Sequence, residues 1–227
     1  MFITQRLKEV IYRRYDITFS RTGDDIQLLK LVNFAQPGTY VDVGCWHPIK
    51  ASNTYRFYAR GWKGICIDAN PLIKTTFNKY RPNDNFVNCL IGSESSVDME
   101  YFLLEEEFSS MNTLDYQFLL DHGIQDKIKT ILKLPVLSLK SVLDQHLTTS
   151  DKLAFFDVDV EGYDLEVLKS NDWLKYRPKV VMVESNLNIE EDLKSEVYSF
   201  MKSVGYRYIA KSVVNRSLEN TFFIDDN

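Results

Sequence analysis

The chain has 227 residues, of which 44% are hydrophobic, 26% charged and 13% aromatic, and its formal net charge is -5. This composition is typical of a globular protein with one large core, and the negative charge provides no overall field that would attract a nucleic acid. No apolar run approaches the ~20 residues that cross a bilayer, and residues 1–15 contain no apolar leader segment.

Residues 1–36 predict an N-terminal helical segment packed on the domain that follows, 37–227. Apolar residues recur at helical spacing over 1–15 beside basic ones, a pattern that also suits a helix lying on a membrane or on a partner. Asp24 predicts the start of a second helix, which we expect to end near Ala35.

Two short apolar runs, 40–44 and 64–68, form the centre of the predicted fold, and each leads to an acidic residue and a turn. A helix over 53–61 would connect them, which makes a β-turn-α-β unit. In an open α/β sheet, ligands lie beyond the carboxyl ends of the strands, where Gly44 and Asp68 would lie. A carboxylate there can accept hydrogen bonds from both hydroxyls of a ribose, so we expect a nucleoside-containing cofactor.

The turn after Gly44 helps to choose between cofactors. A dinucleotide site usually has three glycines, which let the backbone approach the pyrophosphate, whereas this turn has one glycine followed by the bulky residues 45–48. S-adenosylmethionine has no phosphate and carries a sulfonium cation, so its site tolerates a nearby carboxylate such as Asp42. The residues favour S-adenosylmethionine, and the alternative is an NAD-dependent oxidoreductase.

The remaining elements predict an α/β fold with a Rossmann-like, mostly parallel seven-stranded sheet and helices on both faces. After the second strand we expect a helix over 71–80, a strand with its turn over 85–92, a strand over 96–104, short helices over 116–122 and 139–147, and a short extended piece over 134–138. These are followed by a strand with its turn over 153–162, a helix over 164–174, a strand over 179–184, a helix over 190–204, and strands over 206–212 and 221–225. Residues 92–151 form an insertion over the cofactor crevice, a natural place for substrate selection. The strand over 96–104 alternates in polarity and is expected to be antiparallel.

Several motifs resemble those of the FkbM family of S-adenosylmethionine-dependent methyltransferases, over residues 40–184. The motifs are Val41-Asp42-Val43-Gly44, Ser52-Asn53-Thr54, residues 61–68, and Asp159-Val160-Glu161-Gly162-Tyr163-Asp164 with Val167-Leu168. Two positions depart from the family pattern: Pro48 replaces a second glycine, and Asp157 stands where the family often has lysine. The resemblance implies the class I methyltransferase fold and O-methyl transfer to a hydroxyl, of a sugar in a glycan or glycoconjugate.

Asp157, Asp159 and Glu161 recur at period two, which places them on one face of a strand end where mutual repulsion raises at least one pKa. Asp159 or Glu161 is our candidate to orient or deprotonate the acceptor, and the alternative is an acidic turn that only caps the next helix. His47 is a candidate second base or substrate contact, or a histidine held by structural hydrogen bonds.

The expected cofactor-binding residues lie at the ends of the first three strands and at the start of the first connecting helix. They are Asp42, Val43, Gly44, Asn53, Asp68, Ala69, Asn88 and Gly92. We expect no metal; the alternative is Mg²⁺ held by Asp159, Glu184 and Asn186.

The expected partner is a small-molecule or glycan acceptor, with no nucleic acid, and a homodimer remains open. The three cysteines lack metal-ligand spacing and suit reduced, buried thiols, so we expect a cytoplasmic protein without an integral membrane segment. A non-catalytic module that binds the cofactor or a glycan is the remaining alternative.

Overall fold

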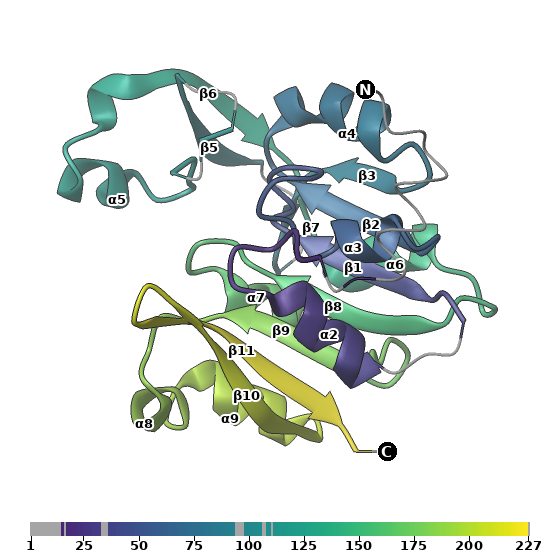
Figure 1. The fold of residues 1–227 in the computed structure, drawn as a ribbon. Coiled ribbons are helices and arrows are strands. Elements are labelled where there is room, and N and C mark those ends of the chain that lie inside the picture. Colours follow the sequence, from purple (N-terminus) through teal and green to yellow (C-terminus); the bar gives the residue numbers. More distant parts are fainter. Residues whose placement is uncertain are drawn as a thin grey trace.

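A seven-stranded sheet forms the centre of the fold (Figure 1). The computed structural model of the protein describes residues 15, 17–32, 36–93, 98–105, 108–109 and 111–226. From one edge to the other, the strands are β10 (Tyr206–Val214), β11 (Ser217–Asp225), β9 (Val180–Glu184), β8 (Leu153–Val158), β1 (Thr39–Val43), β2 (Lys63–Asp68) and β3 (Asn85–Asn88). Neighbours from β3 to β9 are parallel, whereas β11 is antiparallel to both β9 and β10. The predicted sheet is therefore confirmed.

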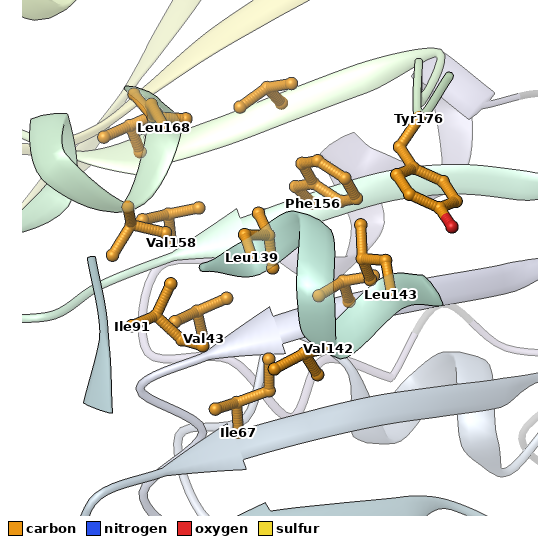
Figure 2. Close-up of a cluster of buried hydrophobic side chains, with 14 of the residues drawn as sticks. Val43, Ile67, Ile91, Leu139, Val142, Leu143, Phe156, Val158, Leu168 and Tyr176 are labelled. Atoms are coloured by element: carbon orange, nitrogen blue, oxygen red, sulfur yellow. The ribbon is translucent and has the colours of Figure 1, made fainter. Parts of the chain in front are cut away.

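Helices cover both faces of the sheet, because successive side chains of a strand point to opposite sides. Val43 and its neighbours on one face pack with α6 (Leu139–His146), α7 (Asp164–Lys169) and α9 (Glu196–Ser203), as Figure 2 shows for Leu139, Leu143 and Leu168. On the opposite face, Tyr40 packs in a second cluster with residues of α2 (Asp24–Val32), α3 (Tyr55–Tyr58) and α4 (Lys74–Tyr80). α6 lies within residues 92–151, and its apolar side packs in this main core.

The N-terminal expectations fall partly outside the described residues. The helix expected over 1–15 lies there, apart from Tyr15, and so do residues 33–35 at the expected end of α2. The start of α2 at Asp24 is as predicted.

The strand and turn expected over 85–92 form two short strands in different sheets. β3 ends at Asn88, whose side-chain amide donates to the backbone carbonyls of Asp68 (2.8 Å) and Ala69 (2.9 Å) and so closes the end of the β2–β3 ladder. The chain then turns away, and β4 (Leu90–Ile91) pairs with β7 (Val136–Leu137) in a separate parallel sheet.

An arm of two antiparallel strands extends from the body of the molecule (Figure 1). β5 (Met99–Leu104) pairs with β6 (Ile128–Leu134), and between them lie α5 (Tyr116–Asp121) and the short helix η2 (Gln125–Lys127). The arm has a small core around Phe102 and Leu119. The antiparallel strand expected over 96–104 is confirmed for Met99–Leu104, whereas β6 was not predicted.

The helix expected over 190–204 is two helices, α8 (Ile189–Asp192) and α9. The break occurs because the Ser195 side chain caps α9 by accepting a hydrogen bond from the backbone N–H of Tyr198 (3.0 Å). Within the described residues, no helix has the length and apolar character needed to span a membrane.

Candidate active site

A cavity of about 400 Å³ lies beyond the carboxyl ends of the central parallel strands. Parallel strands bring their carboxyl ends to one edge of the sheet, so the loops after β1, β2, β8 and β9 surround one space. The predicted residues that line it are Asp42, Val43, Gly44, Asn53, Asp68, Ala69, Asp159 and Glu161. Three others, His47, Asn88 and Gly92, are not among its lining residues.

Asp68, the last residue of β2, is held by two backbone hydrogen bonds. Its Oδ2 accepts from the N–H of Trp46 (2.9 Å), and its Oδ1 accepts from the N–H of Asn70 (2.8 Å). A carboxylate has about four lone-pair sites, so both oxygens can still accept a ligand hydroxyl. Burial raises the pKa of Asp68 to about 6, although both backbone bonds oppose the shift.

Gly44 is required where the turn after β1 meets the turn after β8. Its φ is +86°, and a Cβ at this position would lie 1.7 Å from the backbone carbonyl oxygen of Asp159. The Asp159 N–H in turn donates to the carbonyl of Val43 (3.0 Å). A side chain is therefore excluded at Gly44 because the turn after β1 lies directly against the turn after β8.

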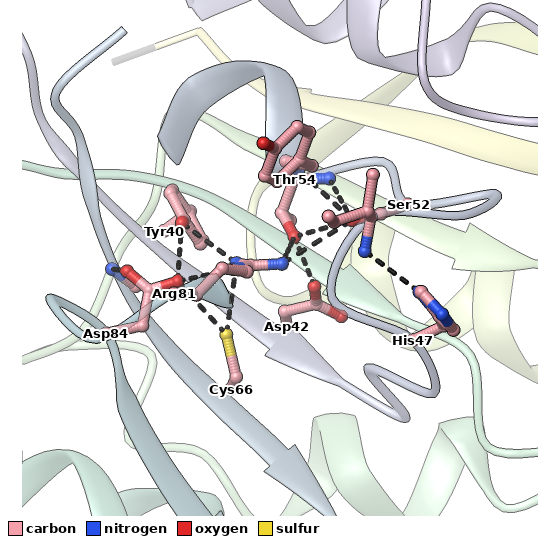
Figure 3. Close-up of polar contacts among 11 residues, drawn as sticks. Tyr40, Asp42, His47, Ser52, Thr54, Cys66, Arg81 and Asp84 are labelled. Atoms are coloured by element: carbon pink, nitrogen blue, oxygen red, sulfur yellow. Dashed lines mark hydrogen bonds and ion pairs between the residues drawn. The ribbon is translucent and has the colours of Figure 1, made fainter. Parts of the chain in front are cut away.

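Arg81, which follows α4, joins a buried polar network (Figure 3). Only 1% of Arg81 is exposed. Its Nε donates to Asp84 (2.7 Å), one Nη donates to the Tyr40 hydroxyl (2.9 Å), and the other donates to the Thr54 hydroxyl (3.0 Å). The Thr54 hydroxyl donates to the Asp42 carboxylate, so the network reaches the cavity wall.

Asp42 and Asp157 are direct neighbours in the parallel β1–β8 register, so their side chains lie on the same face of the sheet. Both line the cavity, and each is only 5% exposed. Burial raises the pKa of Asp42, while Arg81 and Thr54 oppose the shift. Burial and the charge of Asp42 raise the pKa of Asp157 well above its usual value, against a contribution from Asn53.

Glu161 follows β8 and has a left-handed backbone conformation, with φ at +54°. Asp164 holds this turn from both sides, because its carboxylate accepts from the N–H groups of Val160 (3.1 Å) and Gly162 (3.2 Å). Burial and the nearby Glu184 raise the pKa of Glu161 to about 7. Strained non-glycine residues concentrate at functional sites, and a carboxylate with this pKa can exchange protons near neutral pH.

Asp159, Glu161 and Glu184 bring carboxylate oxygens within 4.8 Å of one another. Burial, followed by the charges of Glu184 and Glu161, raises the pKa of Asp159 well above its usual value. Three oxygens at this separation could also ligate a divalent cation. Asn186, which we considered as a ligand from the sequence, is not among the lining residues of the cavity.

His47 makes structural hydrogen bonds within its own turn. Its Nδ1 accepts from the backbone N–H groups of Ile49 (3.0 Å) and Lys50 (2.9 Å), and burial lowers its pKa. Its ring lies 4.8 Å from that of Phe108, whose carbonyl accepts from the Trp46 indole (2.9 Å). The turn after β1 is thus attached to the segment that follows β5.

The cavity is also lined by residues that were not predicted for the site, among them Arg21, Asp24, Glu219 and Asn220. Asn220 of β11 donates to Asp24 of α2 across 2.8 Å, although 196 positions separate them in sequence. No local pattern could have placed these two side chains at one site.

Acidic side chains dominate the lining of the cavity. Among the described residues, Arg21 is the one basic side chain in the lining. The carboxylate residues there are Asp24, Asp42, Asp68, Asp157, Asp159, Glu161, Glu184 and Glu219. This charge suits a cationic ligand.

Comparison with known protein families identifies the domain. The model of the methyltransferase FkbM domain matches residues 38–208, most of the chain. The chain belongs to the FkbM methyltransferase family. It is therefore a methyltransferase, and S-adenosylmethionine is its cofactor. Among curated proteins, none matches this FkbM methyltransferase in sequence.

Solved structures with some similarity to this FkbM methyltransferase include other methyltransferases. Precorrin-6y C5,15-methyltransferase from Geobacter metallireducens has a TM-score of 0.49 and 11% identity, with 89% of this chain and 87% of that chain covered. A putative RNA methyltransferase from Pyrococcus horikoshii has a TM-score of 0.47 and 8% identity, with 99% and 98% covered. 1,6-Didemethyltoxoflavin-N1-methyltransferase from Burkholderia thailandensis, with S-adenosylhomocysteine bound, has a TM-score of 0.46 and 8% identity, with 90% and 77% covered.

The chemistry of the FkbM methyltransferase cavity fits the cofactor. Asp68 retains lone pairs for the hydroxyls of a ribose. The carboxylates of the lining suit a sulfonium cation and an ammonium group. Ile73 and Leu90 supply apolar surface in the same cavity.

Proposed function

We propose that this FkbM methyltransferase methylates a hydroxyl group, and that the hydroxyl belongs to a sugar in a glycan or glycoconjugate. The observation that supports O-methylation is the position of Glu161, whose pKa is about 7, in the same cavity as Asp68. A sugar hydroxyl is a weak acid, so its methylation benefits from a base that is active near neutral pH.

In this proposal, Asp68 binds the ribose hydroxyls of the cofactor. Ala69, Ile73 and Leu90 contact the adenine, and Asp42 stabilises the positive end of the cofactor. Thr54 and Arg81 act as positioning residues, because their hydrogen bonds fix the Asp42 carboxylate.

Bound S-adenosylmethionine supplies a methyl group that is already activated by its positive sulfur. Glu161 accepts the proton of the acceptor hydroxyl, whose oxygen takes the methyl group. Asp159 orients the acceptor by accepting a hydrogen bond, and Asp164 keeps Glu161 in place through the backbone of the turn. We propose that these steps require no metal.

The test uses S-adenosylmethionine with a labelled methyl group and a panel of sugars, nucleotide sugars and cell-envelope fractions. We expect label in a sugar product, bound as a methyl ether that survives mild alkali, and equal transfer in the presence of EDTA. Label that alkali releases as a methyl ester, or that is bound to nitrogen, would contradict O-methylation of a sugar.

A further inference from the structure

A second cavity, of about 160 Å³, adjoins the cavity described above. The two share four lining residues: Asn112, Thr113, Glu161 and Tyr163. The remaining lining residues of the smaller cavity are Met111, Asp115, Phe118 and Gly162. The smaller cavity therefore lies between the segment around α5 and the turn after β8, and Glu161 stands where the two cavities meet.

Hydrogen bonds to β5 and within the segment hold the residues before α5 in place beside the smaller cavity. The Asn112 side chain accepts from the N–H of Leu104 (2.9 Å), and the backbones of Thr113 and Phe102 exchange hydrogen bonds of 2.9 and 3.3 Å. Asp115 caps α5 by accepting from the N–H of Gln117 (2.8 Å). The wall of the smaller cavity is thus fixed to the arm.

The lining of the smaller cavity combines apolar and polar groups. Met111 and the rings of Phe118 and Tyr163 offer apolar surface to the C–H face of a ring. Thr113, Asp115 and Glu161 offer oxygens that can accept hydrogen bonds from hydroxyls. This mixture suits a small ring that carries several hydroxyl groups.

The charge of the two cavities determines which rings are suitable. Among the described residues, the smaller cavity is lined by two carboxylates, Asp115 and Glu161, and by no basic side chain. The larger cavity adds further acidic residues, including Glu184. A phosphate or carboxylate group would meet repulsion without a partner to compensate its desolvation.

We infer that the smaller cavity is the acceptor subsite of the methyltransferase, and that it binds an uncharged, polyhydroxylated ring while rejecting anionic sugars. The hydroxyl to be methylated then lies beside Glu161, at the opening into the cofactor cavity. If the acceptor is a nucleotide sugar, its diphosphate lies outside this subsite. This inference rests on the proposed function and adds the location and charge of the acceptor.

Saturation-transfer NMR with the full chain and saturating S-adenosylhomocysteine tests the inference. The probes are methyl α-D-glucoside and methyl α-L-rhamnoside as neutral sugars, and glucuronate and glucose 6-phosphate as anionic ones. We expect signals from at least one neutral probe and none from the anionic probes. Equal or stronger signals from an anionic probe, or none from both neutral probes, would overturn the inference.

Three variants locate the probe. Met111→Trp fills the smaller cavity, and Phe118→Leu removes a ring while keeping apolar bulk in the arm. Leu120→Ala changes an exposed residue of α5 outside both linings and serves as the control. We expect Met111→Trp to weaken neutral sugar binding about tenfold or more, Phe118→Leu to weaken it severalfold, and Leu120→Ala to leave it unchanged.

The affinity for S-adenosylhomocysteine separates this inference from the proposed function. Met111 and Phe118 do not line the larger cavity, so we expect both variants to retain that affinity. Wild-type sugar binding in Met111→Trp would overturn the subsite. A protein that methylates nitrogen or a carboxylate would instead overturn the proposed function.

Discussion

Arg81 is connected to Asp42 through one hydroxyl group, that of Thr54. The guanidinium donates to this hydroxyl across 3.0 Å, and the hydroxyl donates to the carboxylate. The Thr54 proton is therefore directed at Asp42, and a residue outside the cavity lining determines how a lining residue is held.

Thr54→Val tests this connection, because it removes the hydroxyl and keeps the branched shape. Asp42 loses a hydrogen bond that lowers its pKa, so the pKa rises further. We expect the variant to bind S-adenosylmethionine roughly threefold to tenfold more weakly than the wild type at pH 8. When the pH is lowered, the affinity of the variant should begin to decline at a higher pH than that of the wild type. Calorimetry across pH measures both effects. Thr54→Ser keeps the hydroxyl and should resemble the wild type; equal losses in both variants would contradict the role of the hydroxyl.

Arg81→Met tests the energetic importance of the buried network. The Arg81 and Asp84 side chains are 0% and 1% exposed, so the variant leaves a buried carboxylate without its cation. We expect the free energy of unfolding to fall by about 3–5 kcal/mol. Arg207→Met is the matched control, because the Arg207–Asp226 pair is exposed and should be worth about 1 kcal/mol or less. Urea unfolding that gave similar losses for both variants would contradict this account.

Gly44 and Gly61 have the same backbone conformation, so their alanine variants distinguish the cost of backbone strain from the cost of a steric clash. Gly44 and Gly61 have φ values of +86° and +87°, but only a Cβ at Gly44 would meet the Asp159 carbonyl, whereas one at Gly61 would meet open space. We expect Gly61→Ala to cost about 1–2 kcal/mol of stability, and Gly44→Ala to cost about 1–3 kcal/mol more. Denaturant unfolding measures the difference. Equal costs would show that the contact between the two loops is not the constraint.

We expect Glu161→Gln to lower kcat and to raise the stability of the folded state. As the proposed base, Glu161 contributes to catalysis, so we expect kcat to fall about a hundredfold or more. Its folded-state pKa of about 7 exceeds the usual value of 4.5, so the folded state loses stability as pH rises between these values, and the full penalty is present above pH 7.

Glutamine cannot ionise, so the Glu161→Gln variant should avoid this penalty. We expect a higher Tm than the wild type at pH 8 and little difference at pH 4. Although its carboxyl is partly desolvated, Glu161 as a whole residue remains accessible to solvent, and screening keeps the gain to roughly 1–3 °C. A variant with wild-type kcat, or with a lower Tm at pH 8, would contradict this role.

The sequence could predict the sheet and the residues at the ends of its central strands. The apolar runs that lead into Gly44, Asp68 and Glu161 are local patterns, and the rule that ligands lie beyond parallel strand ends brings them together. Asp159 and Glu161 do line one cavity with Asp68, as this argument expected.

Other parts of the site depend on contacts that local patterns do not encode. From the sequence, Arg81 is predicted only to end a helix before a proline. Its burial arises from packing against Tyr40 and Phe77. β6 was overlooked because its sequence, Ile-Lys-Thr-Ile-Leu-Lys-Leu, does not alternate strictly between apolar and polar residues, and its partner β5 is not adjacent in sequence. His47 was a candidate from its position in sequence alone, and its ring faces backbone groups of its own turn.

Isothermal titration calorimetry with S-adenosylhomocysteine tests the central claim, that the cavity at the ends of β1, β2 and β8 binds the cofactor through Asp68. We predict one molecule bound per chain, no binding of NADH, and roughly tenfold to hundredfold weaker affinity in Asp68→Ala, since the lost hydrogen bonds to a charged group are worth ~1.5–3 kcal/mol. Asp126→Ala, which changes an exposed aspartate of η2 outside the cavity, should bind as the wild type does. Undiminished affinity in a folded Asp68→Ala protein, or binding of NADH in place of S-adenosylhomocysteine, would contradict the account.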